Sequence, residues 1–169
     1  MREQLAVLKC PVFGEAPQPV ASVHPEDLDY RLTMPLGPLS PRIARDSTRA
    51  VLSAYGMFGM VDAAVQVVGE LVACAWQFTP DEVAYVSLRY RDGGLEIVLY
   101  DGHRRHGHPR LVAACDARRR AALRVLGCVV RACEGEWGFG EAREPGGGTR
   151  MWVVLPGWGA LGFGEGGSR

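Results

Sequence analysis

Lysine is nearly absent from this chain, which has only Lys9 beside eighteen arginines. We interpret that imbalance as a bias toward GC-rich codons, not as a functional signal. The five cysteines are odd in number and form no Cys-x-x-Cys pair, and several lie in apolar stretches of helical character. Such cysteines behave as small hydrophobic residues, so the sequence predicts a reducing cytoplasm and no disulfide framework.

Long apolar runs and a secretory leader are missing as well. No stretch approaches the roughly 18 uninterrupted apolar residues of a transmembrane helix. Residues 1–9 include the acidic Glu3 and a very short apolar run, unlike a signal peptide. We therefore expect no contact with a membrane.

The composition predicts one globular domain between two irregular ends. The chain has 169 residues, 47% of them apolar and 22% charged, which is enough for a single core. Residues 1–29 contain four prolines and predict an extended leader, partly disordered or draped over the domain. Residues 30–156 form the domain. The segment 157–169 has six glycines and predicts a flexible tail.

The pattern of residues predicts the secondary structure of the domain. We expect an edge strand at 30–36, a helix that begins at Ser40-Pro41 and ends before Gly56, and a largely apolar, buried helix over 61–78. A hairpin of 83–90 and 95–100, a helix over 110–133 and a hairpin of 136–143 and 149–155 follow. This order predicts an α+β two-layer sandwich, with a mixed, mostly antiparallel sheet and helices on one face.

The segment from His103 to Arg131 is strongly basic, with eight arginines against Asp116 alone. It indicates either an anionic partner or a solvated arginine-rich helix. Three imidazoles, of His103, His106 and His108, could hold zinc with Cys115, but their spacing matches no closed zinc module and the arginines repel a cation. A solvated loop is favoured and no metal is predicted. Nucleic acid is also disfavoured, since no stacking aromatic residues interleave with the arginines.

The run from Glu70 to Thr79, written ELVACAWQFT, is the most informative motif. Glu70 and Cys74 are four residues apart and share one helix face. The run resembles the helix of the histidine-kinase-like ATPases, written Glu-Leu-Val-x-Asn-Ala-x-x-His-Thr in bacterial anti-sigma-factor serine kinases. In that family the glutamate acts as the base and the asparagine holds magnesium. Here Cys74 replaces the asparagine and Phe78 the histidine, and a thiol is a poor magnesium ligand.

Further motifs of the same family follow in order. The resemblance implies that Asp101, in Tyr100-Asp101-Gly102, accepts a hydrogen bond from the adenine amino group. The alternative is a turn residue, since Asp-Gly after a strand is also a common turn. The resemblance also implies that Thr149, in Gly147-Gly148-Thr149, lies near phosphate. The alternative is that these residues simply form a glycine turn that leads into a strand. The family's glycine-rich lid is missing, since residues 116–123 are alanines, arginines and a leucine after Asp116. Glu70 could also be a buried partner for an arginine.

This resemblance implies a small bacterial cytoplasmic regulator that contacts a sigma factor or an antagonist protein, possibly as a homodimer. Because two nucleotide motifs are eroded, we expect protein binding with lost or weak ATP binding. The candidate nucleotide residues are Cys74, Asp101, Gly102 and Thr149. The alternative is an active serine kinase that transfers the γ-phosphoryl group of ATP to a partner, with Glu70 as the base.

Overall fold

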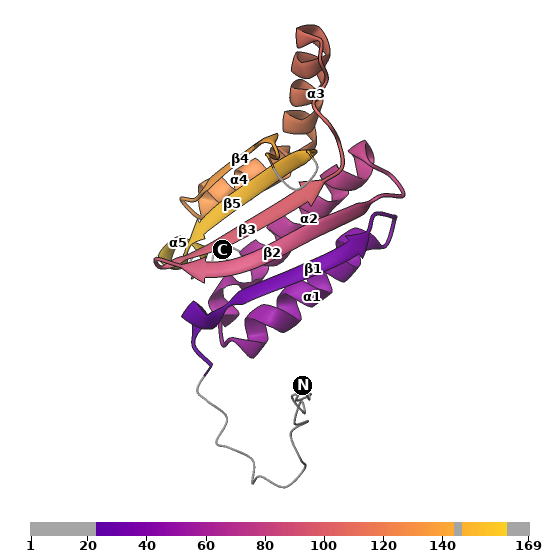
Figure 1. Ribbon diagram of the computed structural model, residues 1–169. Helices are drawn as coiled ribbons and strands as arrows, with labels where there is room; N and C mark the ends of the chain where they lie inside the picture. The colour runs from indigo at the N-terminus through magenta and orange to yellow at the C-terminus, as the bar shows by residue number, and fades with distance from the viewer. Residues whose placement is uncertain (1–22, 144–146, 162–169) are drawn as a thin grey trace, which may run out of the picture.

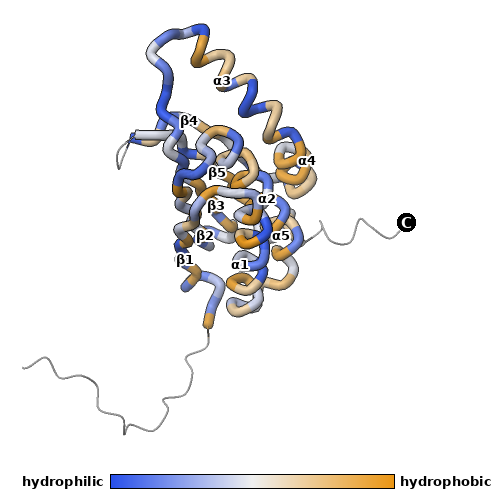
Figure 2. The backbone as a smooth tube through the Cα atoms, turned by 90° about the vertical axis from the view of Figure 1, so that its right-hand side faces the viewer, coloured by the Kyte–Doolittle hydropathy of each residue, from blue (hydrophilic) through white to orange (hydrophobic). Residues whose placement is uncertain are grey.

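The chain folds into two layers, a sheet and a set of helices on one of its faces. The computed structural model describes residues 23–143 and 147–161. Figure 1 shows the sheet in front and the helices behind it, and Figure 2, turned by 90°, shows strands on one side and helices on the other. The predicted α+β two-layer sandwich is confirmed.

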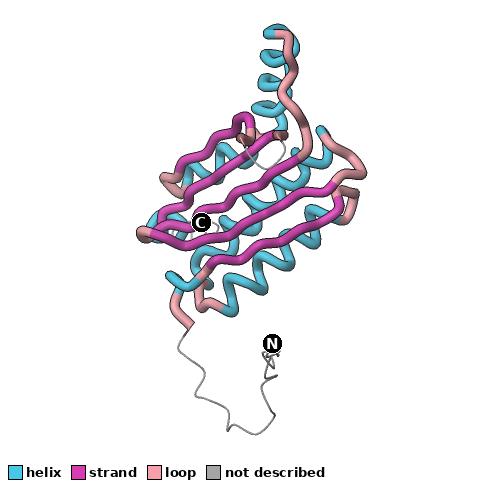
Figure 3. Tube along the Cα trace, in the orientation of Figure 1, coloured by secondary structure: helices cyan, strands magenta, loops and turns pink. Residues whose placement is uncertain are grey.

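Five strands form one sheet in the order β1-β2-β3-β5-β4 (Figure 3). Each of the pairings in the described ranges is antiparallel. β3 lies at the centre, so both of its edges are hydrogen-bonded, and β5 pairs with it after the chain has passed through two helices and the edge strand β4. The strands are β1 (Asp29–Pro35), β2 (Val83–Arg91), β3 (Gly94–Asp101), β4 (Glu136–Glu141) and β5 (Thr149–Pro156).

The β2–β3 hairpin turns at the predicted place. Asp92 and Gly93 both have positive φ angles, 51° and 75°. Two central residues with positive φ match the twist of the flanking strands, and Asp-Gly supports that backbone at little cost. The turn sets the register that pairs Leu88 with Ile97, and both of these side chains are buried in the core.

Helix α2 (Val61–Phe78) is the core helix of the helical layer. It packs against α1 (Ser40–Ala54), α4 (Arg124–Ala132) and the sheet. The segment Phe58–Phe78 is apolar and long enough to cross a membrane by length and composition, but 67% of its most apolar window is buried within the protein. Its packing is therefore that of a core helix in a soluble domain, as its all-round apolar sequence predicted.

The predicted helix over 110–133 is in fact two helices. α3 (Pro109–Ala122) ends before Leu123, which is fully buried and has a non-helical ψ of 17°, and α4 begins at the next residue. The halves differ in burial: α4 buries Leu126, Val129 and Val130, whereas α3 buries Arg119 alone. The break lets α4 lie on the core while α3 projects beyond the sheet (Figures 1 and 2).

The part of each predicted irregular end that lies next to the domain is packed against it. Within the leader, Leu28 is 1% exposed and its carbonyl accepts a hydrogen bond from the backbone of Tyr90. Within the tail, residues 157–161 form a short helix, α5 (Gly157–Leu161), in which Ala160 is 1% exposed. The rest of the leader (1–22) and of the tail (162–169) lies outside the described residues.

The contrast between α2 and α3 predicts the effect of two matched substitutions. Leu71→Ala in α2, where the side chain is 1% exposed, should lower the free energy of unfolding by about 2–5 kcal/mol because it leaves a cavity. Leu111→Ala in α3, where the side chain is 54% exposed, should change it by less than about 1 kcal/mol. Urea denaturation measures both, and equal losses would contradict the assignment of α2 as the core helix.

Candidate functional site

The candidate site lies at one end of the central strand, where β3 terminates at Asp101. The Asp101 side chain is 0% exposed, and each of its oxygens has a partner. Oδ1 accepts a hydrogen bond from the backbone N–H of His103 at 3.0 Å, and Oδ2 accepts one from Arg119 Nη1 at 2.9 Å. The carboxylate is therefore held on both sides by groups of its own chain.

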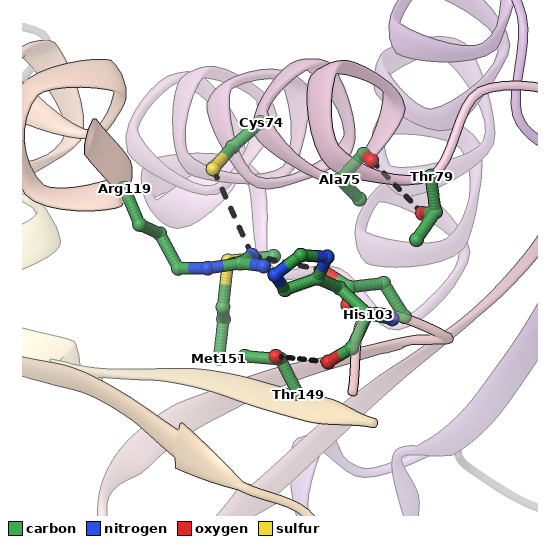
Figure 4. A network of polar contacts seen from close by, with 8 residues as sticks. Cys74, Ala75, Thr79, His103, Arg119, Thr149 and Met151 are labelled. Atoms are coloured by element: carbon green, nitrogen blue, oxygen red, sulfur yellow. Dashed lines mark hydrogen bonds and ion pairs between the residues drawn. The ribbon is translucent and has the colours of Figure 1, made fainter. Parts of the chain in front are cut away.

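Arg119 reaches this carboxylate from α3 and forms a buried ion pair with it. Its side chain is 3% exposed and lies between α2 and β5 (Figure 4). Nη1 also contacts the sulfurs of Met151, at 3.2 Å, and Cys74, at 3.9 Å. Nη2 is buried and has no hydrogen-bond partner within the described ranges. Desolvated charges like these are stable only when paired, so each residue of the pair requires the other.

Both positions at which the Glu70–Thr79 motif departs from the family pattern touch Arg119. Cys74 contacts its Nη1, and the ring of Phe78 lies under the guanidinium, with Cζ 4.1 Å from the ring centroid. An aromatic face attracts a desolvated cation. Asparagine and histidine at these positions would offer hydrogen-bonding groups, whereas cysteine and phenylalanine offer a soft, largely apolar wall on which the arginine lies.

The Cys74 thiol is itself kept neutral. Burial raises its pKa to about 11, against the opposing effect of the nearby Arg119 charge. A protonated thiol is neither a nucleophile nor a ligand for a hard cation. Cys74 therefore packs against Arg119. We call Arg119 and the residues that its guanidinium contacts the Arg119 cluster: Cys74, Phe78, Asp101 and Met151.

The loop after β3 is tied to β5 beside the cluster. Thr149 pairs with Asp101 across the two strands, and its hydroxyl donates to the carbonyl of His103 at 2.8 Å. The His103 ring meets Phe78 edge-on, with centroids 5.1 Å apart. Burial, followed by the charge of Arg119, lowers the pKa of His103, so its imidazole is neutral near pH 7.

A small cleft, partly open to solvent, adjoins the cluster between the 103–108 loop, α3 and β4. Within it His106 Nε2 lies 3.1 Å from Cys115 Sγ. His108 lies apart from this contact, because its Nδ1 accepts the Arg110 backbone N–H and caps α3. Of the four residues considered for zinc, three therefore have donor atoms near one another: His103, His106 and Cys115.

The sequence-predicted site residues separate into two groups. Cys74, Asp101 and Thr149 lie together around Arg119 and His103. Gly102 follows Asp101, and a Cβ there would meet the end of the exposed, flexible Glu82 side chain, which can turn away, so packing does not require glycine at this position. Glu70 accepts a hydrogen bond from Gln66 Nε2 at 2.9 Å, and no contact recorded for the described residues joins it to Asp101 or Arg119.

Sequence reasoning did not single out Arg119 or Met151. Arg119 is one of three consecutive arginines, and no local pattern distinguishes the one that is buried from its exposed neighbours. Met151 is one apolar residue in a strand of them. One sequence signal could have indicated a buried partner for this helix face. Cys74 and Phe78 stand where the resembled pattern has asparagine and histidine, and two less polar side chains on one helix face suit a packed side chain better than a hydrated metal ion.

No protein-family model matches the chain, and no curated protein matches it. The cluster presents no free carboxylate, and its one thiol is neutral. Its central carboxylate and guanidinium neutralise each other.

The buried pair predicts a non-additive double-mutant cycle. Arg119→Met should lower the free energy of unfolding by about 3–5 kcal/mol, because it leaves the Asp101 charge buried without a partner. Adding Asp101→Asn should recover much of that loss, since the double variant has no unpaired charge. Arg124→Met is the matched control: this arginine, the first residue of α4, is exposed and should change stability by less than about 0.5 kcal/mol.

Chemical denaturation of the unaltered chain, the single variants Arg119→Met and Asp101→Asn, the double variant and the control Arg124→Met measures the cycle. If Arg119→Met and Arg124→Met cost the same, or if the two changes at the pair simply add, the ion pair does not have the role assigned to it.

Proposed function

We propose that this chain is a bacterial, cytoplasmic regulatory protein of the histidine-kinase-like ATPase type, whose nucleotide site is closed by its own Arg119 and which acts by binding another protein. One observation carries the proposal. Both oxygens of Asp101, the residue that the resemblance implies would read adenine, are occupied by the chain itself, one of them by a buried guanidinium at 2.9 Å.

The cost of opening that site supports the proposal. An adenine amino group could bond to Asp101 only after Arg119 had left, and Arg119 would then give up the ion pair, the Met151 contact and the Phe78 ring together. A neutral amino group does not compensate a buried carboxylate as a guanidinium does. ATP binding would therefore be weak or absent.

The metal requirement of phosphoryl transfer points the same way. Metal ions neutralise the charge that develops on the transferred group. The position at which the resemblance implies a magnesium ligand holds the buried, neutral thiol of Cys74. The alternative, an active serine kinase, keeps one supporting feature: Glu70 stands one turn before Cys74 on α2. It would need another residue to hold magnesium.

An apolar groove at the opposite end of β3 supports a protein-binding role. Phe58, 69% exposed, and Trp158, 65% exposed, line it together with the β2–β3 turn. Large exposed aromatic side chains in one groove are typical of contact surfaces. A sigma factor or an antagonist-like regulator is the partner that the resemblance implies, with self-association into a homodimer as a further property to test.

Nucleotide titration tests the closed site. We expect no heat of binding when the full chain is titrated with ATP and Mg²⁺ to millimolar concentration, and no change with Cys74→Asn alone, since Arg119 still occupies Asp101. Arg119→Ala combined with Cys74→Asn should give measurable binding, because it opens the site and restores an oxygen ligand. Micromolar binding to the unaltered chain, abolished by Asp101→Asn, would overturn the proposal in favour of the kinase.

Affinity purification from the native cells tests the groove. The tagged chain should co-purify with a sigma factor or an antagonist-like regulator identified by mass spectrometry, and replacing Phe58 and Trp158 by serine should reduce recovery at least about tenfold, since aromatic anchors dominate contact energy. Tyr85→Ser is the control, because Tyr85 is 55% exposed on β2 and lies outside the groove. Equal recovery with all three proteins would exclude this groove as the contact surface.

A further inference from the structure

We infer that the chain has a zinc site formed by His103, His106 and Cys115, in the cleft between the 103–108 loop and α3. One donor atom from each of the three lies within 4.8 Å of the other two. His106 Nε2 and Cys115 Sγ lie 3.1 Å apart. This site adjoins the proposed nucleotide position but shares no ligand residue with it, and it does not depend on the regulatory function.

The donor set and its spacing match the requirements of zinc. Imidazole nitrogen and thiolate sulfur are the usual zinc ligands, bound at about 2.0–2.1 Å and 2.3 Å, which places tetrahedral ligands about 3.3–3.6 Å from one another. The 3.1 Å pair is near that spacing, and the donor atom of His103 lies within 4.8 Å of both other donor atoms. Sulfur with imidazole selects against magnesium and calcium, which prefer oxygen.

His103 is held in place before any metal arrives. Its backbone N–H donates to Asp101, its carbonyl accepts from Thr149, and its ring is packed on Phe78. Its Nε2 is nevertheless buried and has no hydrogen-bond partner in the described part of the chain. An unpaired buried nitrogen costs free energy, and a metal bond would satisfy it.

The surrounding charges allow a cation, despite the basic sequence. The nearest buried arginine, Arg119, is neutralised by Asp101 at 2.9 Å. Asp116 and Glu141 line the same cleft, and the thiol becomes a thiolate when it binds metal. One of these carboxylates, or a water molecule, would complete a fourth position, whereas the exposed Arg105 can turn toward solvent.

A metal here would clamp α3. The ligands join the loop that leaves β3 to the middle of a helix that otherwise projects from the sheet. Cys115 is one turn before Arg119 on the same helix face, so the metal would also hold the turn that delivers Arg119 to Asp101. Zinc should therefore stabilise the fold as well as bind to it.

Cobalt(II) titration of the chelator-treated full chain is the test. We expect one equivalent to give the intense visible bands of tetrahedral Co²⁺ and a thiolate-to-cobalt charge-transfer band, both lost on addition of Zn²⁺. His103→Ala, His106→Ala and Cys115→Ser should each weaken binding at least about 100-fold, beyond the range seen for outer-shell partners. Cys115→Ser should also abolish the charge-transfer band.

Two matched variants serve as controls. His108→Ala and Cys128→Ser remove the same residue types from positions outside the cluster and should leave the spectrum and the affinity unchanged. Zinc should raise the melting temperature of the parent chain and of these controls but not that of Cys115→Ser, and circular dichroism without metal checks that each variant folds. Weak octahedral bands, or a charge-transfer band that survives Cys115→Ser, would overturn the assignment.

Discussion

The Asp101–Arg119 ion pair is the interaction on which the rest of the site depends. A carboxylate with no exposed surface at the end of the central strand requires a positive partner, and the guanidinium that supplies it comes from α3, a helix with no other buried residue. α3 has little apolar surface with which to pack, so this pair anchors its C-terminal end. Met151, Cys74 and Phe78 complete the enclosure around a charge that would otherwise be unstable away from water.

Under the proposed assignment to the histidine-kinase-like ATPases, the residues that differ from the family motif form one arrangement around that charge. Cysteine in place of the family's asparagine would remove an oxygen ligand, phenylalanine in place of its histidine would supply a ring face, and the arginine-bearing α3 would replace its glycine-rich lid. Each of these differences alone would weaken nucleotide binding. Together they suit the guanidinium of Arg119 in the place where ATP would bind. For this reason we propose that the chain has kept the fold of these ATPases but lost ATP binding.

The two ends of β3 divide the molecule into different surfaces. At the Asp101 end lie the ion pair, the 103–108 loop and the proposed zinc ligands His103, His106 and Cys115. At the Gly94 end lie the hairpin turn, α5 and the exposed aromatic pair Phe58 and Trp158. A rigid central strand joins them, so a partner at the groove and a ligand at the cleft would bind about one strand length apart without competing for the same residues.

The sequence by itself determined the elements whose signals are local. Asp92-Gly93 specifies a turn through its positive φ angles, the apolar run of α2 specifies a buried helix, and their order specifies a two-layer α+β fold. Tertiary structure alone decided which of three adjacent arginines is buried, where the 110–133 helix breaks, and that His106 meets Cys115 while His108 caps a helix. Those outcomes depend on contacts between residues far apart in the chain, such as Arg119 with Asp101 and Cys74, and no local pattern encodes the distance between them.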